Sequence, residues 1–190
     1  MKIGVLALQG AFREHRRLFE ELGAETTLVK LPEHLEGLNG LVIPGGESTT
    51  IGKLLREYNL LQPVQSLGQE GFPMMGTCAG MIVLAKQIVG APEPHLGLMD
   101  ITVDRNSFGR QRESFETDLD IPVIGSEPFP AVFIRAPHVE NVGEGVKVLA
   151  RYNDRVVAAR EDNLVAFSFH PELTGDHRLH RYFLDIVEQA

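Results

Sequence analysis

The first half of the chain alternates short apolar runs with segments whose apolar residues recur every three or four positions. The first pattern predicts buried strands and the second predicts amphipathic helices. The predicted strands are residues 3–8, 24–31, 38–44 and 72–75. The predicted helices are residues 12–22, one turn over 32–36, a segment after Ser48 that reaches Tyr58, residues 62–69, and a segment after Gly80. This alternation indicates an α/β fold with a doubly wound, mostly parallel sheet flanked by helices.

After about residue 90 the pattern changes to short strands. Two prolines and a glycine between residues 92 and 97 end the preceding helix. The predicted strands of this half are residues 101–103, 131–134, 146–152, 156–160 and 164–169. Because Asn153-Asp154 fits a hairpin turn, we expect an antiparallel extension in the C-terminal half. A final helix over about 175–188 completes a single domain, residues 1–190, without repeats or linkers.

Composition and charge limit the kinds of partner and the cellular compartment that fit this chain. The 190 residues are 43% hydrophobic and 23% charged, which is usual for a globular protein. A net charge of −8 argues against nucleic acid or an anionic membrane as the main partner. The single cysteine excludes an internal disulfide and suits a reducing compartment. The apolar run before Gln9 is too short for a signal peptide, and no segment has membrane-spanning length, so we expect a cytoplasmic protein.

That single cysteine, Cys78, stands at a predicted strand-to-helix junction with the sequence Gly-Thr-Cys-Ala-Gly. Gly-x-Cys-x-Gly at such a junction is the cysteine form of a nucleophile elbow, in which a sharp turn exposes the reactive side chain. Gly76 and Gly80 leave room for the turn, and the start of the next helix favours a thiolate. A lone cysteine more often fills core volume. The flanking glycines and a distant His-Pro-Glu sequence favour a nucleophile here.

The loop Pro44-Gly45-Gly46-Glu47-Ser48 also follows a predicted strand. In an open α/β sheet, ligands gather at the carboxyl ends of the strands, where this loop would meet the elbow. Two successive glycines can direct backbone N–H groups at a substrate, as an oxyanion hole requires. The loop equally fits a plain turn with Ser48 or Thr49 as the helix N-cap, and both interpretations can hold together.

His170-Pro171-Glu172 follows the last predicted strand. Proline holds the preceding residue extended, so the side chains of His170 and Glu172 can point the same way. A carboxylate beside an imidazole fixes its tautomer and supports its charged form. With Cys78 these residues predict a Cys-His-Glu triad for nucleophilic catalysis.

The stretches that carry a family resemblance span residues 3–178 and are IGVLALQGAFREH, LVIPGGESTTIGKLL, GTCAGMIVLAK, RNSFGRQRESFE, VFIRAPHVE and SFHPELTGDHR. Together they resemble class I, triad-type glutamine amidotransferases, and more narrowly the glutaminase subunits of pyridoxal 5′-phosphate synthases. The resemblance implies a flavodoxin-like fold and hydrolysis of L-glutamine to L-glutamate and ammonia through a cysteine thioester. It also implies a hetero-oligomeric complex with a (β/α)8-barrel synthase subunit, which uses the ammonia to make pyridoxal 5′-phosphate (vitamin B6). That compound is then a product of the complex, and the chain is expected to need no cofactor and no metal.

The resemblance also implies a role for individual residues. Cys78 is implied as the nucleophile and His170, held by Glu172, as the proton shuttle. The implied oxyanion donors are the backbone N–H groups of Gly46 and Ala79. The implied glutamine contacts are Gly46, Glu47, Ser48, Arg105, Ile134 and Arg135. Free glutamine carries a carboxylate, which suits the two arginines, and an ammonium, which suits Glu47 or a backbone carbonyl such as that of Ile134.

Several charged residues fit simpler interpretations. Arg110 and Arg112 fit a solvated loop, and His138 is expected to be structural or at the rim of a subunit contact. His177 and His180 lie one turn apart on the final helix, and a solvated helix face is favoured over a zinc site.

Two alternative functions remain open. One is a stand-alone cysteine hydrolase of similar fold, which would ignore glutamine and need no partner. The other is a non-catalytic regulatory subunit. An intact Cys78, His170 and Glu172 argue against the second, because a degenerate site usually lacks one of them.

Overall fold

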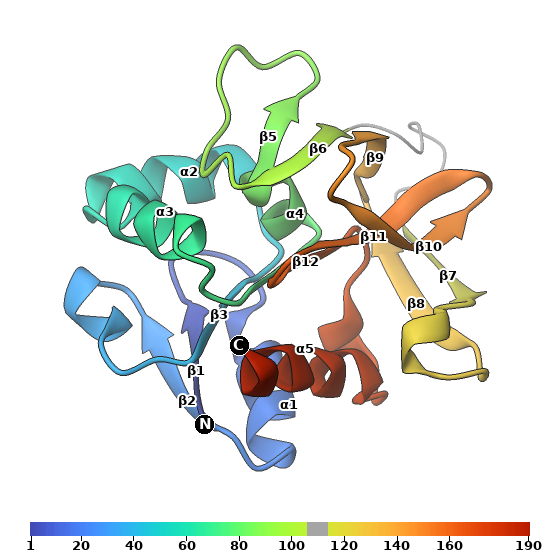
Figure 1. Ribbon diagram of the computed structural model, residues 1–190, viewed down its shortest axis with the longest axis horizontal. Helices are drawn as coiled ribbons and strands as arrows, with labels where there is room; N and C mark the ends of the chain where they lie inside the picture. Colours follow the sequence, from blue (N-terminus) through green and yellow to red (C-terminus); the bar gives the residue numbers. More distant parts are fainter. Residues whose placement is uncertain (106–113) are drawn as a thin grey trace.

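The computed structural model describes residues 1–105 and 114–190, and a twisted sheet runs through its centre (Figure 1). Five parallel strands form one half of this sheet, in the order β2 (Glu25–Val29), β1 (Lys2–Leu6), β3 (Gly40–Ile43), β4 (Met74–Thr77) and β12 (Leu164–Phe167). This is the flavodoxin-like strand order, which reverses between β1 and β3. Loops that leave the carboxyl ends of strands near such a reversal diverge, and the space between them is where ligands bind in this architecture.

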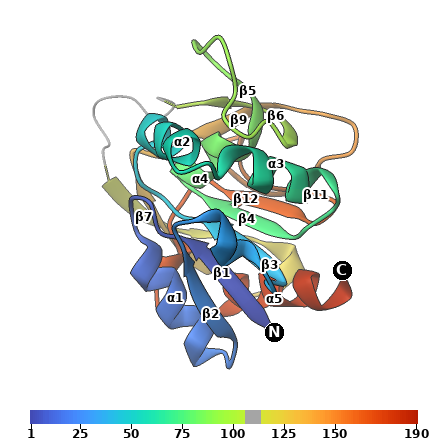
Figure 2. The same ribbon diagram turned by 90° about the vertical axis from the view of Figure 1, so that its left-hand side faces the viewer.

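Helices cover both faces of the parallel strands (Figure 2). One face carries α2 (Ser48–Glu57), α3 (Leu61–Gln69) and α4 (Ala79–Leu84), and the other carries α1 (Phe12–Glu21) and α5 (Arg178–Gln189). Each face has its own core, because successive strand residues point to opposite sides. Leu6 and Ile43 belong to the core with α2, α3 and α4, whereas Ile3 and Val5 belong to the core with α1 and α5.

Aromatic packing holds α5 against α1. Phe183 of α5 and Phe19 of α1 are fully buried, and their rings meet edge to face with centroids 6.1 Å apart. Burying a side chain of this size stabilises the fold by roughly 1.5–3 kcal/mol. Both rings belong to one core cluster with further apolar residues of α5, so the packing of α5 against α1 does not depend on this pair alone, and both helices also carry buried histidines.

Beyond β12 the strand pairings are antiparallel, except that the last two strands of the sheet pair in parallel. β11 (Arg155–Glu161) pairs with β12 and with β10 (Lys147–Tyr152), and the sheet continues through β9 (His138–Val142) and β6 (Met99–Asp104) to β5 (Ala85–Ile88). A separate hairpin pairs β7 (Ser114–Leu119) with β8 (Phe129–Ile134). Asn153 and Asp154 make the predicted turn between β10 and β11, both at positive φ. The predicted fold class, with its antiparallel extension, is confirmed.

The structure adds three strands that the sequence does not predict: β5, β7 and β9. Short 3₁₀ turns occur at η1 (Pro32–Leu35), η2 (Pro122–Ile124) and η3 (Pro171–Leu173), the first of them inside the predicted helical turn. Within residues 1–105 and 114–190, no helix has both the length and the apolar character needed to cross a membrane.

Candidate active site

Cys78 occupies the sharp turn between β4 and α4. It is the N-cap residue of α4 and has φ 51° and ψ −108°, a conformation that costs a non-glycine residue on the order of 1–3 kcal/mol. A Cβ on Gly80 would stand 2.0 Å from the carbonyl oxygen of Ile43, and one on Gly76 would stand 2.5 Å from that of Gly80. Both glycines are therefore required by close backbone approach, as expected for a nucleophile elbow.

His170 and Glu172 follow β12 and meet as the sequence predicts. Nδ1 of His170 lies 2.5 Å from Oε1 of Glu172, and both residues are buried. The backbone N–H of His170 donates to the carbonyl oxygen of Val132 on β8, which anchors the segment. Burial alone would lower the pKa of His170, but interactions with Cys78 and Glu172 outweigh it and raise the pKa to about 10. The imidazole is thus stabilised as the imidazolium.

Gly45 brings the three chain segments together. A Cβ at this position would stand 2.5 Å from Cε1 of His170 and 3.3 Å from Cβ of Cys78. The loop after β3 therefore lies directly against the imidazole and the cysteine, with no room for a side chain. The sulfur of Cys78 also lies 3.7 Å from the carbonyl oxygen of Ile134 at the end of β8.

Gln9 and Ala11, in the loop after β1, hold the backbone of the glycine-rich loop through hydrogen bonds. The side-chain oxygen of Gln9 accepts a hydrogen bond from the N–H of Glu47 at 2.8 Å. The carbonyl oxygen of Gly45 accepts one from the N–H of Ala11 at 3.0 Å. Ala79 is the first residue of α4, where the backbone N–H has no acceptor within its own helix.

A cavity of about 270 Å³ opens beside Cys78. Its lining residues are Gly46, Glu47, Ser48, Cys78, Ala79, Ile82, Arg105 and Arg135. All except Ile82 are candidate site residues from the sequence analysis, and they come from the loops after β3, β6 and β8 and from the elbow. A cavity whose lining includes two guanidinium groups and one carboxylate can bind a molecule that carries both charges.

Glu47, rather than Ser48 or Thr49, is the N-cap of α2. Its carboxylate accepts hydrogen bonds from the backbone N–H groups of Thr49 at 3.1 Å and Thr50 at 2.7 Å. Partial burial opposes ionisation, but these hydrogen bonds lower the pKa of Glu47. The expected N-cap was wrong by one or two residues, because a longer side chain folds back onto the same N–H groups.

The sequence analysis misses one part of the site, a pair of histidines behind the triad. His15 on α1 and His180 on α5 are fully buried and 2.9 Å apart, between Nδ1 of His15 and Nε2 of His180. The prediction of a solvated face for His180 is therefore wrong. His177 is partly exposed and lies 2.7 Å from Glu21. The sequence did carry one signal of this burial, because His15 stands at a position of its helix where the apolar residues recur.

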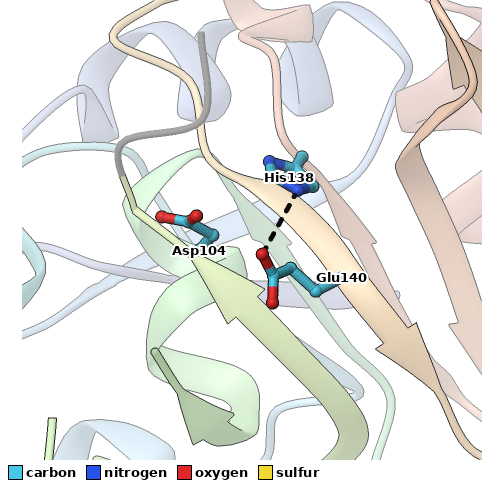
Figure 3. Close-up of side chains that lie close together, drawn as sticks. All are labelled: Asp104, His138 and Glu140. Atoms are coloured by element: carbon cyan, nitrogen blue, oxygen red, sulfur yellow. Dashed lines mark ion pairs between the residues drawn. The ribbon is translucent and has the colours of Figure 1, made fainter. Parts of the chain in front are cut away.

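A second polar cluster lies where β6 and β9 pair (Figure 3). Ligand atoms of Asp104, His138 and Glu140 all lie within 4.8 Å of one another, a spacing that a metal ion could bridge. His138 is half-buried, and burial together with the charge of Arg155 lowers its pKa, while Asp104 and Glu140 act in the opposite direction. The expectation of no metal stays a prediction. Arg110 and Arg112 lie outside the described residues.

Comparisons with known proteins agree with this geometry. A model of the SNO glutamine amidotransferase family matches residues 5–189. A relative from Pelotomaculum thermopropionicum, named pyridoxal 5′-phosphate synthase subunit PdxT, is 63% identical over 190 residues, which cover 100% of this chain and 97% of the relative. A protein of the same name from Geobacillus kaustophilus is also 63% identical over 190 residues, covering 100% and 96%. A crystal structure described as a glutamine amidotransferase has a TM-score of 0.93 and 55% identity over 98% of each chain.

Proposed function

The chain belongs to the SNO glutamine amidotransferase family, and from this premise we propose that it is the glutaminase subunit of a pyridoxal 5′-phosphate synthase. The reaction is the hydrolysis of L-glutamine to L-glutamate and ammonia. One observation supports it above all others: Cys78, His170 and Glu172, from distant parts of the chain, lie together beside a cavity lined by groups of both charges.

Cys78 is the nucleophile of this proposal. Its thiolate adds to the side-chain carbonyl carbon of glutamine and forms a tetrahedral oxyanion. The imidazolium of His170 then gives its proton to the amide nitrogen, the C–N bond breaks, and ammonia leaves a γ-glutamyl thioester on the sulfur. The raised pKa of His170 suits a group that must carry a proton when the nucleophile is anionic.

Water completes the reaction. Neutral His170 takes a proton from water, the hydroxide adds to the thioester carbon, and the C–S bond breaks to release glutamate and restore the thiolate. Glu172 orients the imidazole through Nδ1 and stabilises its positive charge in both half-reactions.

The backbone N–H groups of Gly46 and Ala79 are the proposed oxyanion donors. Both residues line the cavity beside Cys78. Loss of one such donor typically costs on the order of 10²- to 10³-fold in kcat. The hydrogen bond from Ala11 to the carbonyl oxygen of Gly45 sets the direction in which the Gly46 N–H points, because both groups belong to one planar peptide, and the bond from Glu47 to Gln9 holds the next peptide.

We assign the recognition of glutamine to the positively and negatively charged side chains that line the cavity. Arg105 and Arg135 suit the α-carboxylate of glutamine, and Glu47 with the carbonyl oxygen of Ile134 suits the α-ammonium. Ser48, which is buried and lines the same cavity, adds a hydroxyl for the substrate.

Ammonia released into water would be protonated and lost to a synthase, so a glutaminase of this kind needs a partner docked over its cavity. The two PdxT relatives are named as subunits of pyridoxal 5′-phosphate synthase. For this chain we accordingly infer a complex with a (β/α)8-barrel synthase subunit. A single cysteine with a reactive role suits the reducing cytoplasm, where we expect the complex to work.

Glutamate release from L-glutamine tests the proposal. The assay compares the wild type and Cys78→Ala, each with and without a pyridoxal 5′-phosphate synthase barrel subunit. Release by the wild type with the partner, and none by the variant, is expected. Equal release by both would remove Cys78 from the mechanism. Hydrolysis of unrelated ester substrates without glutamine turnover would favour a stand-alone hydrolase, and no release at all would favour a regulatory subunit.

A further inference from the structure

Glu172 has a second neighbour that the triad does not use. Its Oε1 contacts His170, while its Oε2, which has no hydrogen-bond partner among the described residues, lies 3.4 Å from Nε2 of His15. The side chains of His15 and Glu172 are both fully buried. The same nitrogen of His15 lies 3.0 Å from Oγ1 of Thr77, the residue before Cys78. His15 therefore stands between the carboxylate of the triad and the strand that carries the nucleophile.

Both histidines of the buried pair are neutral. Burial, and then electrostatic interaction with His180 and His170, holds the pKa of His15 well below its usual value. Burial also lowers the pKa of His180 to about 3. In the contact between Nδ1 of His15 and Nε2 of His180, one nitrogen must then donate and the other accept.

The surroundings decide which nitrogen donates. If Nδ1 of His15 carried the proton, the lone pair on its Nε2 could accept the hydroxyl proton of Thr77, but it would also face the carboxylate of Glu172 at 3.4 Å and repel it. That arrangement would also leave an N–H at Nδ1 of His180, a buried atom without a hydrogen-bond partner among the described residues. The reverse arrangement removes the repulsion and leaves a lone pair rather than an N–H unpaired at Nδ1 of His180. In it His180 donates to His15, and the N–H at Nε2 of His15 donates to Oγ1 of Thr77 at 3.0 Å while it faces Oε2 of Glu172 at 3.4 Å.

We propose that His15, oriented by His180, is a positioning residue of the triad, whose neutral N–H holds the carboxylate of Glu172 so that its other oxygen meets His170. This inference rests on the proposed function. A carboxylate buried with one hydrogen-bond partner is costly, and the positive end of a nearby N–H dipole offsets part of that cost electrostatically. Because the donor is neutral, it leaves intact the negative charge that supports the His170 imidazolium, which an arginine or lysine would cancel.

Three variants test the inference. His15→Phe keeps a ring of similar shape but removes the N–H, whereas His15→Gln can return an amide N–H close to the position of Nε2. Phe19→Leu is the matched control, because Phe19 packs edge to face on the ring of His180 with centroids 4.9 Å apart and takes no part in the polar contacts. Each variant is assayed as the full chain with the barrel subunit, after its thermal midpoint has been measured.

We expect His15→Phe to lower kcat on the order of 10- to 100-fold with KM within about twofold, by analogy with the loss of residues that orient metal-ligating histidines. His15→Gln should recover most of that loss, and Phe19→Leu should keep kcat despite a lower midpoint. An unchanged kcat in folded His15→Phe, no recovery in His15→Gln, or an equal loss in Phe19→Leu would each overturn the inference.

A second readout separates this inference from the proposed function. The rate of alkylation of Cys78 by iodoacetamide, followed against pH, reports the thiolate without glutamine or partner. His15→Phe should move this profile to higher pH relative to the wild type, and Phe19→Leu should not. If the wild type releases no glutamate, the proposed function fails, while the alkylation profiles still decide whether His15 supports the triad. Identical profiles for wild type and His15→Phe would count against it.

Discussion

Gly80→Ala probes how tightly the elbow packs on the neighbouring strand. In the structure, the added Cβ would stand 2.0 Å from the carbonyl oxygen of Ile43 and 2.9 Å from its carbonyl carbon. Ordinary contact begins at 3.4 Å, so α4 and β3 would have to separate by about 1.4 Å. The obstacle is backbone at the end of a central strand and cannot rotate away. We therefore expect a loss of about 3 kcal/mol in the free energy of unfolding, at the upper end of typical overpacking costs.

For a chain of 190 residues, that loss corresponds to a fall of roughly 6–12 °C in thermal midpoint. Because Ile43 leads into the glycine-rich loop, the same displacement should lower glutamate release by about 10²-fold. Gly175→Ala is the matched control, since nothing lies within 4 Å of its added Cβ. Calorimetry and the glutamate assay check both variants. If Gly80→Ala melts within about 2 °C of Gly175→Ala and keeps its activity, the tight elbow is refuted.

Three further predictions concern charge. Below pH 6.5 the unfolded chain protonates His180, whereas the folded protein keeps His180 neutral down to about pH 3, so stability falls as pH falls through that window. His180→Leu should reduce the dependence of the unfolding free energy on pH in this window by about 1.4 kcal/mol per pH unit, as measured by urea titrations. Arg105→Ala should raise KM for glutamine by roughly 10- to 100-fold with little change in kcat, whereas exposed Arg151→Ala should change neither. Glu47→Ala should lower the unfolding free energy by about 1 kcal/mol through loss of the α2 cap, and an unchanged denaturation midpoint would contradict that role.

The sequence predicts the parallel half of the fold well because its strands are short apolar runs between clear turn residues. β5 is not predicted because Ala85–Ile88 follows α4 directly, with no glycine, proline or other turn residue between the two elements. The helix ends only through a change to extended backbone at Ala85. β9 is not predicted because most of its residues are exposed, so that no apolar pattern marks it as a strand. It also pairs with β11 at only one residue pair.

The candidate site likewise has a part that local sequence predicts and a part that it does not. Cys78 is predictable because the two flanking glycines indicate a tight turn. His170 and Glu172 are predictable because the proline between them indicates an extended backbone. His15 and His180 are 165 positions apart, and each looks like a single polar residue on a helix. Only the packing of α1 against α5 brings them together, so their contact depends on long-range structure that a local pattern does not encode. The same packing buries His180, whose spacing from His177 suggested a solvated face.

The covalent intermediate on Cys78 is the most direct test of the account. Full-length protein in complex with the barrel subunit is mixed with L-glutamine, quenched in acid within one turnover and analysed by intact-protein and peptide mass spectrometry. The account predicts one γ-glutamyl group on the peptide that carries Cys78 and none in Cys78→Ala. Glutamate formation without any adduct on that peptide, or an adduct that persists in the variant, would contradict it.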